Sequence, residues 1–233
     1  MATSYLTLLQ ASYPDSIHDS ILYNREIHIV ELRRSGPIVM KPELDPREIR
    51  TLQKIKNALL HMMASRIDPI SITDLCAEAQ VTRPTFYKHF SSVAELMEVM
   101  SKETMEDLER RIVIEKKISL QEVDYDELPS NMVALFNHVL ENRQFYEAFI
   151  LIHPDTPFTR YFKATLYHFV KVGLEASIET GAEISVPSDV VINFMTGAFH
   201  ETILWWMLEG YPYTPREMTA IVLRLSINGP YQF

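Results

Sequence analysis

The side chains best suited to chemistry lie in one short segment, residues 82–90, where hydroxyl, basic and aromatic groups alternate. At about 100° per residue of helix, Phe86 and Phe90 share one face, while Lys88 points the opposite way. Thr85 lies on that outward face too. Lysine can contact guanine N7 and O6 in the major groove of DNA, and a threonine methyl can contact thymine. The segment therefore predicts a helix that binds nucleic acid, and an ordinary solvated helix is the alternative.

Basic charge is concentrated around this segment. Between residues 47 and 90 the chain has seven lysines and arginines and four acidic residues, a net charge of +3, whereas the whole chain carries −9 and the remainder therefore −12. Salt screens charges beyond about 10 Å, so an acidic protein can still bind a polyanion through one basic segment. On charge alone, a solvated helical surface explains the pattern equally well.

The sequence offers no comparable set of residues for catalysis. Six glycines and no G-x-G-x-x-G or G-x-x-x-x-G-K-[ST] string argue against dinucleotide and P-loop enzymes. His200 and Glu201 begin like a zinc-protease helix, but Leu204 stands where the second histidine would be needed. We therefore expect no metal, no cofactor and no enzymatic activity.

Compartment and membrane association are also constrained. The single cysteine, Cys76, cannot form an internal disulfide and is expected to be buried in a protein of a reducing compartment. The first 15 residues lack the pattern of a secretory signal. The long apolar stretch 190–208 carries Asn193, His200 and Glu201, and a charge at mid-bilayer costs roughly 3 kcal/mol. We expect a soluble, cytoplasmic protein with no membrane partner.

Helical spacing of apolar residues runs through most of the chain and predicts an all-α fold. Ser71 and Asp74 form a capping-box pattern, and Thr82 can cap a second short helix that has Pro84 in its first turn. No convincing alternation of apolar and polar residues appears after residue 40. The expected helices span about 47–65, 71–79, 82–90, 93–116, 129–141, 144–152, 157–179, 187–208 and 215–226.

Two short helices joined by a tight turn, the second polar and aromatic, form a helix-turn-helix arrangement. The run from Ile72 to Phe90, with its string Thr85-Phe86-Tyr87-Lys88-His89-Phe90, resembles the DNA-binding domain of the TetR family of transcriptional regulators. A weaker resemblance covers about residues 132–225, where the strings 205–210 and 214–218 are similar to the end of that family's second domain. The resemblance implies an amino-terminal helix-turn-helix DNA-binding domain over 46–100, followed by a helical ligand-binding and dimerisation domain over 101–233. Residues 1–45 form an extension of unknown role.

The same resemblance assigns roles to single residues. Thr85 and Lys88 would face bases, Tyr87 and His89 would hold backbone or bases, and Thr73 would contact a phosphate. The complete predicted DNA-binding set is Thr73, Thr82, Arg83, Pro84, Thr85, Tyr87, Lys88 and His89.

Three positions depart from the family pattern. Gln80 stands where the turn commonly has glycine, so it must tolerate an unfavourable backbone angle or a different turn. Val93 replaces a lysine that often contacts phosphate, which should weaken DNA binding modestly. Pro84 stands where many relatives have glycine or a small residue.

The carboxy-terminal half contains many aromatic residues, which at helical spacing form either core or the walls of an apolar pocket for a small effector. Glu201 on an apolar helix either lines such a cavity or makes a structural hydrogen bond or dimer contact. The candidate ligand-binding residues are Phe136, Phe149, Phe169, Phe199, Glu201 and Trp205.

The last two helices are the candidate dimer interface, and ordinary monomer core is the alternative. Small residues allow close approach on the first helix, and apolar residues form a face on the second. The residues concerned are Gly197, Ala198, Met218, Ile221, Val222 and Leu225.

These features together predict a homodimeric TetR-type repressor. It binds a palindromic operator in double-stranded DNA and is released by an apolar or aromatic small-molecule effector. The alternative is a TetR-like coregulator that acts through protein partners and keeps the helix-turn-helix as scaffold.

Overall fold

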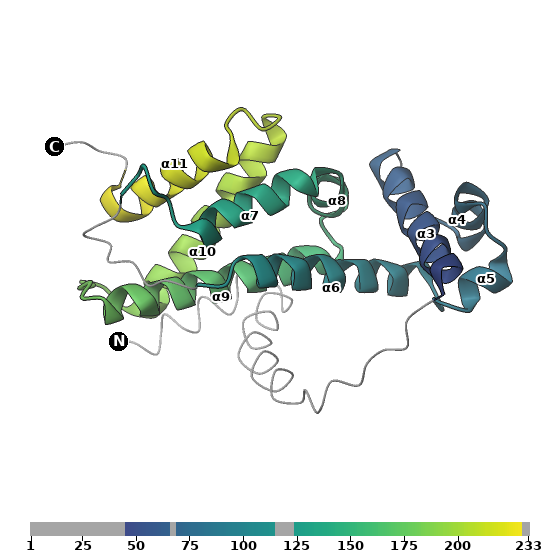
Figure 1. Ribbon diagram of the computed structural model, residues 1–233, viewed down its shortest axis with the longest axis horizontal. Helices are drawn as coiled ribbons and strands as arrows, with labels where there is room; N and C mark the ends of the chain where they lie inside the picture. The colour runs from purple at the N-terminus through teal and green to yellow at the C-terminus, as the bar shows by residue number, and fades with distance from the viewer. Residues whose placement is uncertain (1–44, 66–68, 115–123, 230–233) are drawn as a thin grey trace, which may run out of the picture. The chain divides into compact units, whose positions relative to one another are not determined.

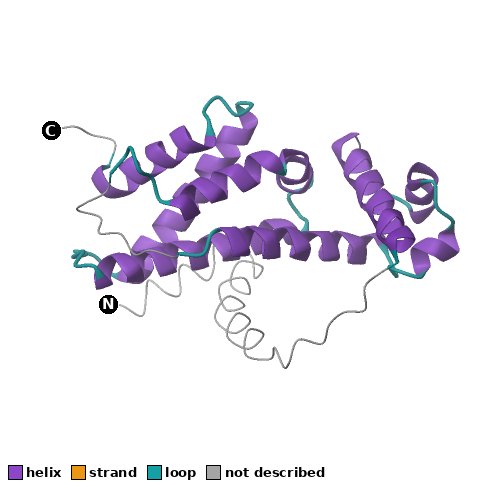
Figure 2. Ribbon diagram, viewed as in Figure 1, coloured by secondary structure: helices purple, strands orange, loops and turns teal. Residues whose placement is uncertain are grey.

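The computed structural model describes residues 45–65, 69–114 and 124–229. In these ranges every regular element is a helix and none is a strand, which confirms the all-α prediction (Figures 1 and 2). The predicted extension over 1–45 lies outside the described residues except for Asp45. The helices carry the labels α3 to α11 of Figure 1.

The first three described helices form the helix-turn-helix unit. They are α3 (Pro46–Ser65), α4 (Ile72–Ala79) and α5 (Arg83–Tyr87). Ser71 caps α4, since its hydroxyl accepts a hydrogen bond from the amide of Asp74 at 3.1 Å, as the capping pattern predicts. A shared apolar core contains Leu59, Leu75 and Phe86, each without solvent exposure. Burial of these side chains fixes the two short helices against α3, because neither is long enough to be stable alone.

The turn between α4 and α5 is made without glycine. Gln80 has φ 55° and ψ 44°, the left-handed conformation that usually requires glycine. The amide of Val81 donates to the carbonyl of Cys76 at 3.0 Å, which closes the end of α4. The chain therefore keeps the expected turn and accepts the unfavourable backbone angle at Gln80.

Helix α6 (Val93–Arg111) connects this unit to the rest of the chain. It runs without a break across the domain boundary predicted between residues 100 and 101. The helix ends at Arg111, not near Lys116 as the periodicity predicted, and residues 115–123 lie outside the described ranges. Lys56 of α3 pairs with Glu103 at 2.5 Å, and Glu98 accepts a hydrogen bond from the Tyr161 hydroxyl, so α6 contacts both α3 and the helices that follow.

The remaining helices pack around α6 and α9. They are α7 (Ser130–Glu141), α8 (Arg143–Tyr146), the π-helix η2 (Glu147–Ile152), α9 (Pro157–Glu179), α10 (Ser188–Leu208) and α11 (Pro215–Asn228). Their bounds agree closely with those predicted, because Pro157, Pro187 and Pro215 mark the starts. The helix predicted over 144–152 is correct in extent but turns into a π-helix after Tyr146.

The apolar stretch near the end of the chain forms α10, and α9 is its main packing partner. No helix within the described ranges has the length and the apolar character needed to cross a bilayer. After α10 the chain turns through Gly210 and Tyr211, both at positive φ, and the indole of Trp206 donates to the carbonyl of Tyr213 at 2.9 Å. Thr214 and Glu217 then form a complete capping box for α11.

Candidate nucleic-acid interface and effector cavity

The start of α5 is fixed by its own hydroxyl groups. The amide of Thr85 donates to the Thr82 side-chain oxygen at 3.3 Å, and the two hydroxyls lie 2.8 Å apart. Pro84 falls in the first turn, where its missing amide hydrogen costs nothing. Phe86 and Phe90 are both buried, as their spacing predicts, with ring centres 5.8 Å apart. Their burial turns the polar side of α5 outward.

The eight predicted DNA-binding residues gather on α5 and at the first turn of α4. Six are exposed: Thr73, Thr82, Arg83, Pro84, Tyr87 and Lys88. Thr85 and His89 are half-buried, and the hydroxyl of Thr85 is already engaged by Thr82. The outward surface of α5 therefore offers a cation, a phenol and backbone-capping hydroxyls to a partner, which is the chemistry that phosphates and base edges require.

One partner of this surface was missed in the sequence. Glu48, in the first turn of α3, has its carboxylate Oε1 3.0 Å from Lys88 Nζ and 3.7 Å from His89 Nδ1. Forty residues separate Glu48 from Lys88. No local spacing relates two side chains that far apart, so only the fold could reveal the pair.

An apolar cavity of about 200 Å³ lies among α7, α9, α10 and α11. Phe169 and Phe199 form part of its wall, with ring centres 6.1 Å apart. Its side-chain polar groups are Asn131, Ser177 and Ser226, and none of the described lining residues is charged. Both serine hydroxyls donate to carbonyls of their own helices, at 2.8 and 2.7 Å. The lining therefore suits an uncharged, mainly apolar molecule.

The other predicted ligand residues lie elsewhere. Phe136 and Phe149 are fully buried in the core, where Phe136 contacts Trp206 and Phe149 stacks on Phe145 with ring centres 4.2 Å apart. Glu201 is exposed and lies 2.9 Å from Nδ1 of the buried His200. Trp205 is 45% exposed. Periodicity places all these residues on helices but does not distinguish packed core from cavity wall.

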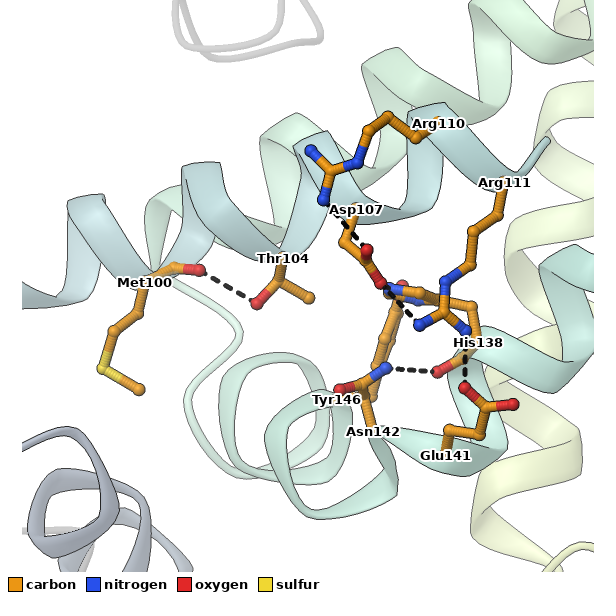
Figure 3. Close-up of polar contacts among 9 residues, drawn as sticks. All are labelled: Met100, Thr104, Asp107, Arg110, Arg111, His138, Glu141, Asn142 and Tyr146. Carbon is orange, nitrogen blue, oxygen red and sulfur yellow. Dashed lines mark hydrogen bonds and ion pairs between the residues drawn. The ribbon is translucent and has the colours of Figure 1, made fainter. Parts of the chain in front are cut away.

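A polar cluster joins the end of α6 to α7 and α8 (Figure 3). Asp107 Oδ2 lies 2.9 Å from Arg111 and 3.4 Å from His138 Nε2. The other ring nitrogen of His138 lies 3.0 Å from the buried Tyr146 hydroxyl, and Arg111 also pairs with Glu141 at 2.5 Å. The cluster therefore links α6, which follows the helix-turn-helix, to α7, which borders the cavity.

Burial and charge set the ionisation of this cluster. Burial lowers the pKa of His138 to about 4, although the charge of Asp107 favours the protonated ring. Partial burial of Asp107 opposes its ionisation, but hydrogen bonding by Arg110 and the charge of Arg111 hold its pKa below the usual value. His138 is therefore neutral and Asp107 ionised near pH 7.

Helix α10 presents an apolar face to solvent. Val190, Phe194 and Leu208 are 59%, 73% and 69% exposed. They lie on one side of the helix together with Gly197, Ala198, Glu201 and Trp205, because the positions differ by three, four or seven residues. On α11, Ile221 and Leu225 are exposed, while Met218 and Val222 are buried within the chain. The predicted dimer residues thus divide into an exposed set and a core set.

A helix-turn-helix with a polar, exposed second helix is the arrangement of one class of DNA-binding motif, and here an all-helical domain with an apolar cavity follows it. Residues 126–228 match the TetR-type family described as "Transcriptional regulator C-terminal region". The match covers the carboxy-terminal part of the chain and agrees with the TetR-family resemblance of its sequence. No curated protein sequence matches the chain.

Solved structures with the same fold include three regulators of low sequence identity. The TetR transcriptional regulator of Streptococcus agalactiae 2603V is 21% identical, with a TM-score of 0.58, and the alignment covers 78% of this chain and 96% of that one. The fatty acid degradation regulator FadR of Bacillus halodurans is 15% identical, with a TM-score of 0.62 over 82% and 100%. FadR of Bacillus subtilis, solved in complex with stearoyl-CoA, is 15% identical, with a TM-score of 0.59 over 77% and 99%.

Proposed function

We propose that the protein is a homodimeric repressor that binds a palindromic operator through α5 and is released by an uncharged small molecule. It acts in the cytoplasm. The observation that carries the proposal is the outward surface of α5, where a polar helix face is fixed over a buried phenylalanine pair. That surface lies outside the apolar core, and its exposed side chains can reach a DNA groove, although Lys88 pairs with Glu48 and the Thr82 hydroxyl caps the helix.

The exposed apolar face of α10 supports a dimer of two copies. Large exposed apolar side chains in a row are unusual for a monomer and mark an interaction surface. Gly197 and Ala198 lie near the middle of this face, where small side chains let two helices approach closely. With Ile221 and Leu225 of α11, each subunit would contribute two helices to a four-helix interface.

The cavity supports release by a ligand. It is bordered by α7, which the polar cluster around Asp107 and His138 joins to α6. A ligand that binds the cavity better in one arrangement of these helices would favour that arrangement, and α6 would carry the change to the helix-turn-helix. The bound stearoyl-CoA of Bacillus subtilis FadR illustrates a small molecule on the same fold, although this cavity favours an uncharged one.

DNA binding is tested by Lys88→Ala, measured by gel shift against a sequence selected by the wild-type protein. Loss of a base contact should cost about 1–3 kcal/mol, or roughly 5- to 150-fold in affinity, and relax the preference at one base pair. Arg83→Ala should weaken binding to all sequences. Lys171→Ala removes the same charge from an exposed position of α9 and is the matched control.

A protein that shifts no DNA at any salt concentration would contradict the proposal and favour the coregulator alternative. Unchanged affinity and unchanged sequence preference in the Arg83→Ala/Lys88→Ala double variant would show that another surface binds the DNA.

A further inference from the structure

Glu48 places a carboxylate beside Lys88, a cation at the outward surface of α5. Its Oε1 atom accepts a hydrogen bond from Lys88 Nζ at 3.0 Å and lies 3.7 Å from His89 Nδ1. One carboxylate oxygen thus faces two groups at the end of α5. The contact joins the first turn of α3 to Lys88 and His89 at the end of α5, and it involves no residue of the apolar core.

Exposure differs sharply across this contact. The side chain of Glu48 is 24% exposed and that of His89 only 11%, whereas Lys88 is 67% exposed. The carboxylate is therefore held in place between α3 and the end of α5, while the lysine ammonium reaches solvent. A partner arriving from solvent therefore reaches the lysine side chain more easily than the Glu48 side chain.

DNA must compete with this carboxylate for Lys88. A phosphate oxygen or a guanine edge that takes the ammonium leaves Glu48 less neutralised and close to a polyanion. Both consequences oppose binding, and both apply to any DNA sequence. The Glu48 side chain is only partly exposed and contacts both Lys88 and His89, which limits its freedom to move away.

We propose that Glu48 limits the affinity of the protein for DNA by competing with DNA for Lys88. The inference rests on the proposed function and adds a residue that acts against binding. Glu48 therefore reduces the sequence-independent electrostatic attraction between the basic segment, residues 47–90, and DNA. The protein thereby depends more on correct base contacts to remain bound.

The test is Glu48→Gln, which keeps the side-chain shape and removes the charge. We expect tighter binding by about two- to five-fold at low salt, the range of an exposed ion pair. The plot of log affinity against log salt should become steeper, by up to about 0.9, because removal of the carboxylate raises the net positive charge that faces the phosphates. Binding is measured by fluorescence anisotropy on a selected site and on an unrelated duplex of equal length.

Glu78→Gln is the matched control. Glu78 lies in the same helix-turn-helix unit and pairs with His61 at 2.8 Å. Replacing it with glutamine changes the net charge by the same amount as Glu48→Gln. His61 lies 13 residues along α3 from Glu48, about 20 Å away along the helix axis. At moderate salt this control should gain little affinity and keep the wild-type salt slope, because screening weakens a charge at that distance.

The double variant Glu48→Gln/Lys88→Ala tests the mechanism. Without Lys88 the gain from Glu48→Gln should largely disappear, and circular dichroism confirms that each variant is folded. If wild-type protein binds DNA and Glu48→Gln matches it in affinity and salt slope, the inference is wrong. It is equally wrong if Glu48→Gln binds more weakly, because the carboxylate would then align Lys88. If neither the wild type nor any variant binds DNA, the proposed function itself is wrong.

Discussion

His138 is almost completely buried between Asp107 and Tyr146, and burial lowers its pKa from 6.5 to about 4. In the unfolded chain the imidazole takes up a proton near pH 6.5, whereas in the folded protein it stays neutral down to about pH 4. The unfolded state therefore binds more protons between these values, and stability falls as pH falls.

We predict that His138 alone lowers the free energy of unfolding by up to about 3 kcal/mol between pH 6.5 and pH 4. Urea unfolding at a series of pH values measures this. His138→Gln should flatten part of the dependence, and His138→Gln/His200→Gln should flatten it further, because burial also lowers the pKa of His200. An equally steep dependence in the double variant would show that other groups are responsible.

At the scale of residues, the sequence predicted that Phe86 and Phe90 are buried and that Lys88 is exposed, because helical geometry relates neighbours directly, whereas Thr85, predicted to face outward, is half-buried. It did not predict the partner of Lys88, since Glu48 comes next to it only through the packing of α3 against the helix-turn-helix. Nor did it separate Phe169 and Phe199, on the cavity, from Phe136 and Phe149, in the core. All four are phenylalanines at helical spacing, so the sequence gives no basis for separating them.

Two helices contain a glycine in their interior, Gly173 in α9 and Gly197 in α10. A Cβ atom added at either position meets no atom within 4 Å. Alanine in a helix interior is more favourable than glycine by about 0.5–1 kcal/mol, so Gly173→Ala should raise stability by that amount. Thermal unfolding monitored by circular dichroism is the measurement.

Gly197→Ala distinguishes the dimer face from ordinary surface. In a monomer it should give the same gain as Gly173→Ala, whereas at a close helix–helix contact the added methyl group weakens association. We expect a smaller gain than for Gly173→Ala, together with a higher dimer dissociation constant in analytical ultracentrifugation. Equal gains and unchanged association would place Gly197 outside the interface.

At the scale of elements, the sequence predicted helix starts well, because capping residues and prolines act locally. Ser71 and Thr82 each accept the hydrogen bond that their position predicts. The π-helix was not predicted. Within it the carbonyl of Phe149 accepts a hydrogen bond from the Thr156 hydroxyl at 2.8 Å, a contact that the helical spacing of the sequence does not indicate.

For the whole molecule, the exposed face of α10 is the basis of the predicted dimer. Phe194 is 73% exposed, so Phe194→Glu should leave the stability of the monomer within about 0.5 kcal/mol. Light scattering should show loss of the dimer, because a carboxylate would be buried in an apolar contact. Leu225→Glu tests α11 in the same way, whereas Val222 is buried and a charge there would disturb folding.

Ile178→Glu is the control for this experiment, since Ile178 is 41% exposed and lies on α9, outside the predicted interface. It should leave the dimer intact. If Phe194→Glu and Leu225→Glu both remain dimeric, the interface lies elsewhere on the molecule.

Two copies of α5, one from each subunit, are expected to bind DNA together. This is tested most directly by selecting bound sequences from a random duplex library and measuring the mass of the complex. We predict two inverted half-sites whose centres are 10–10.5 base pairs apart or a multiple of that spacing, bound by an even number of subunits. Enrichment of no sequence, or of a single half-site bound by one subunit, would contradict the account.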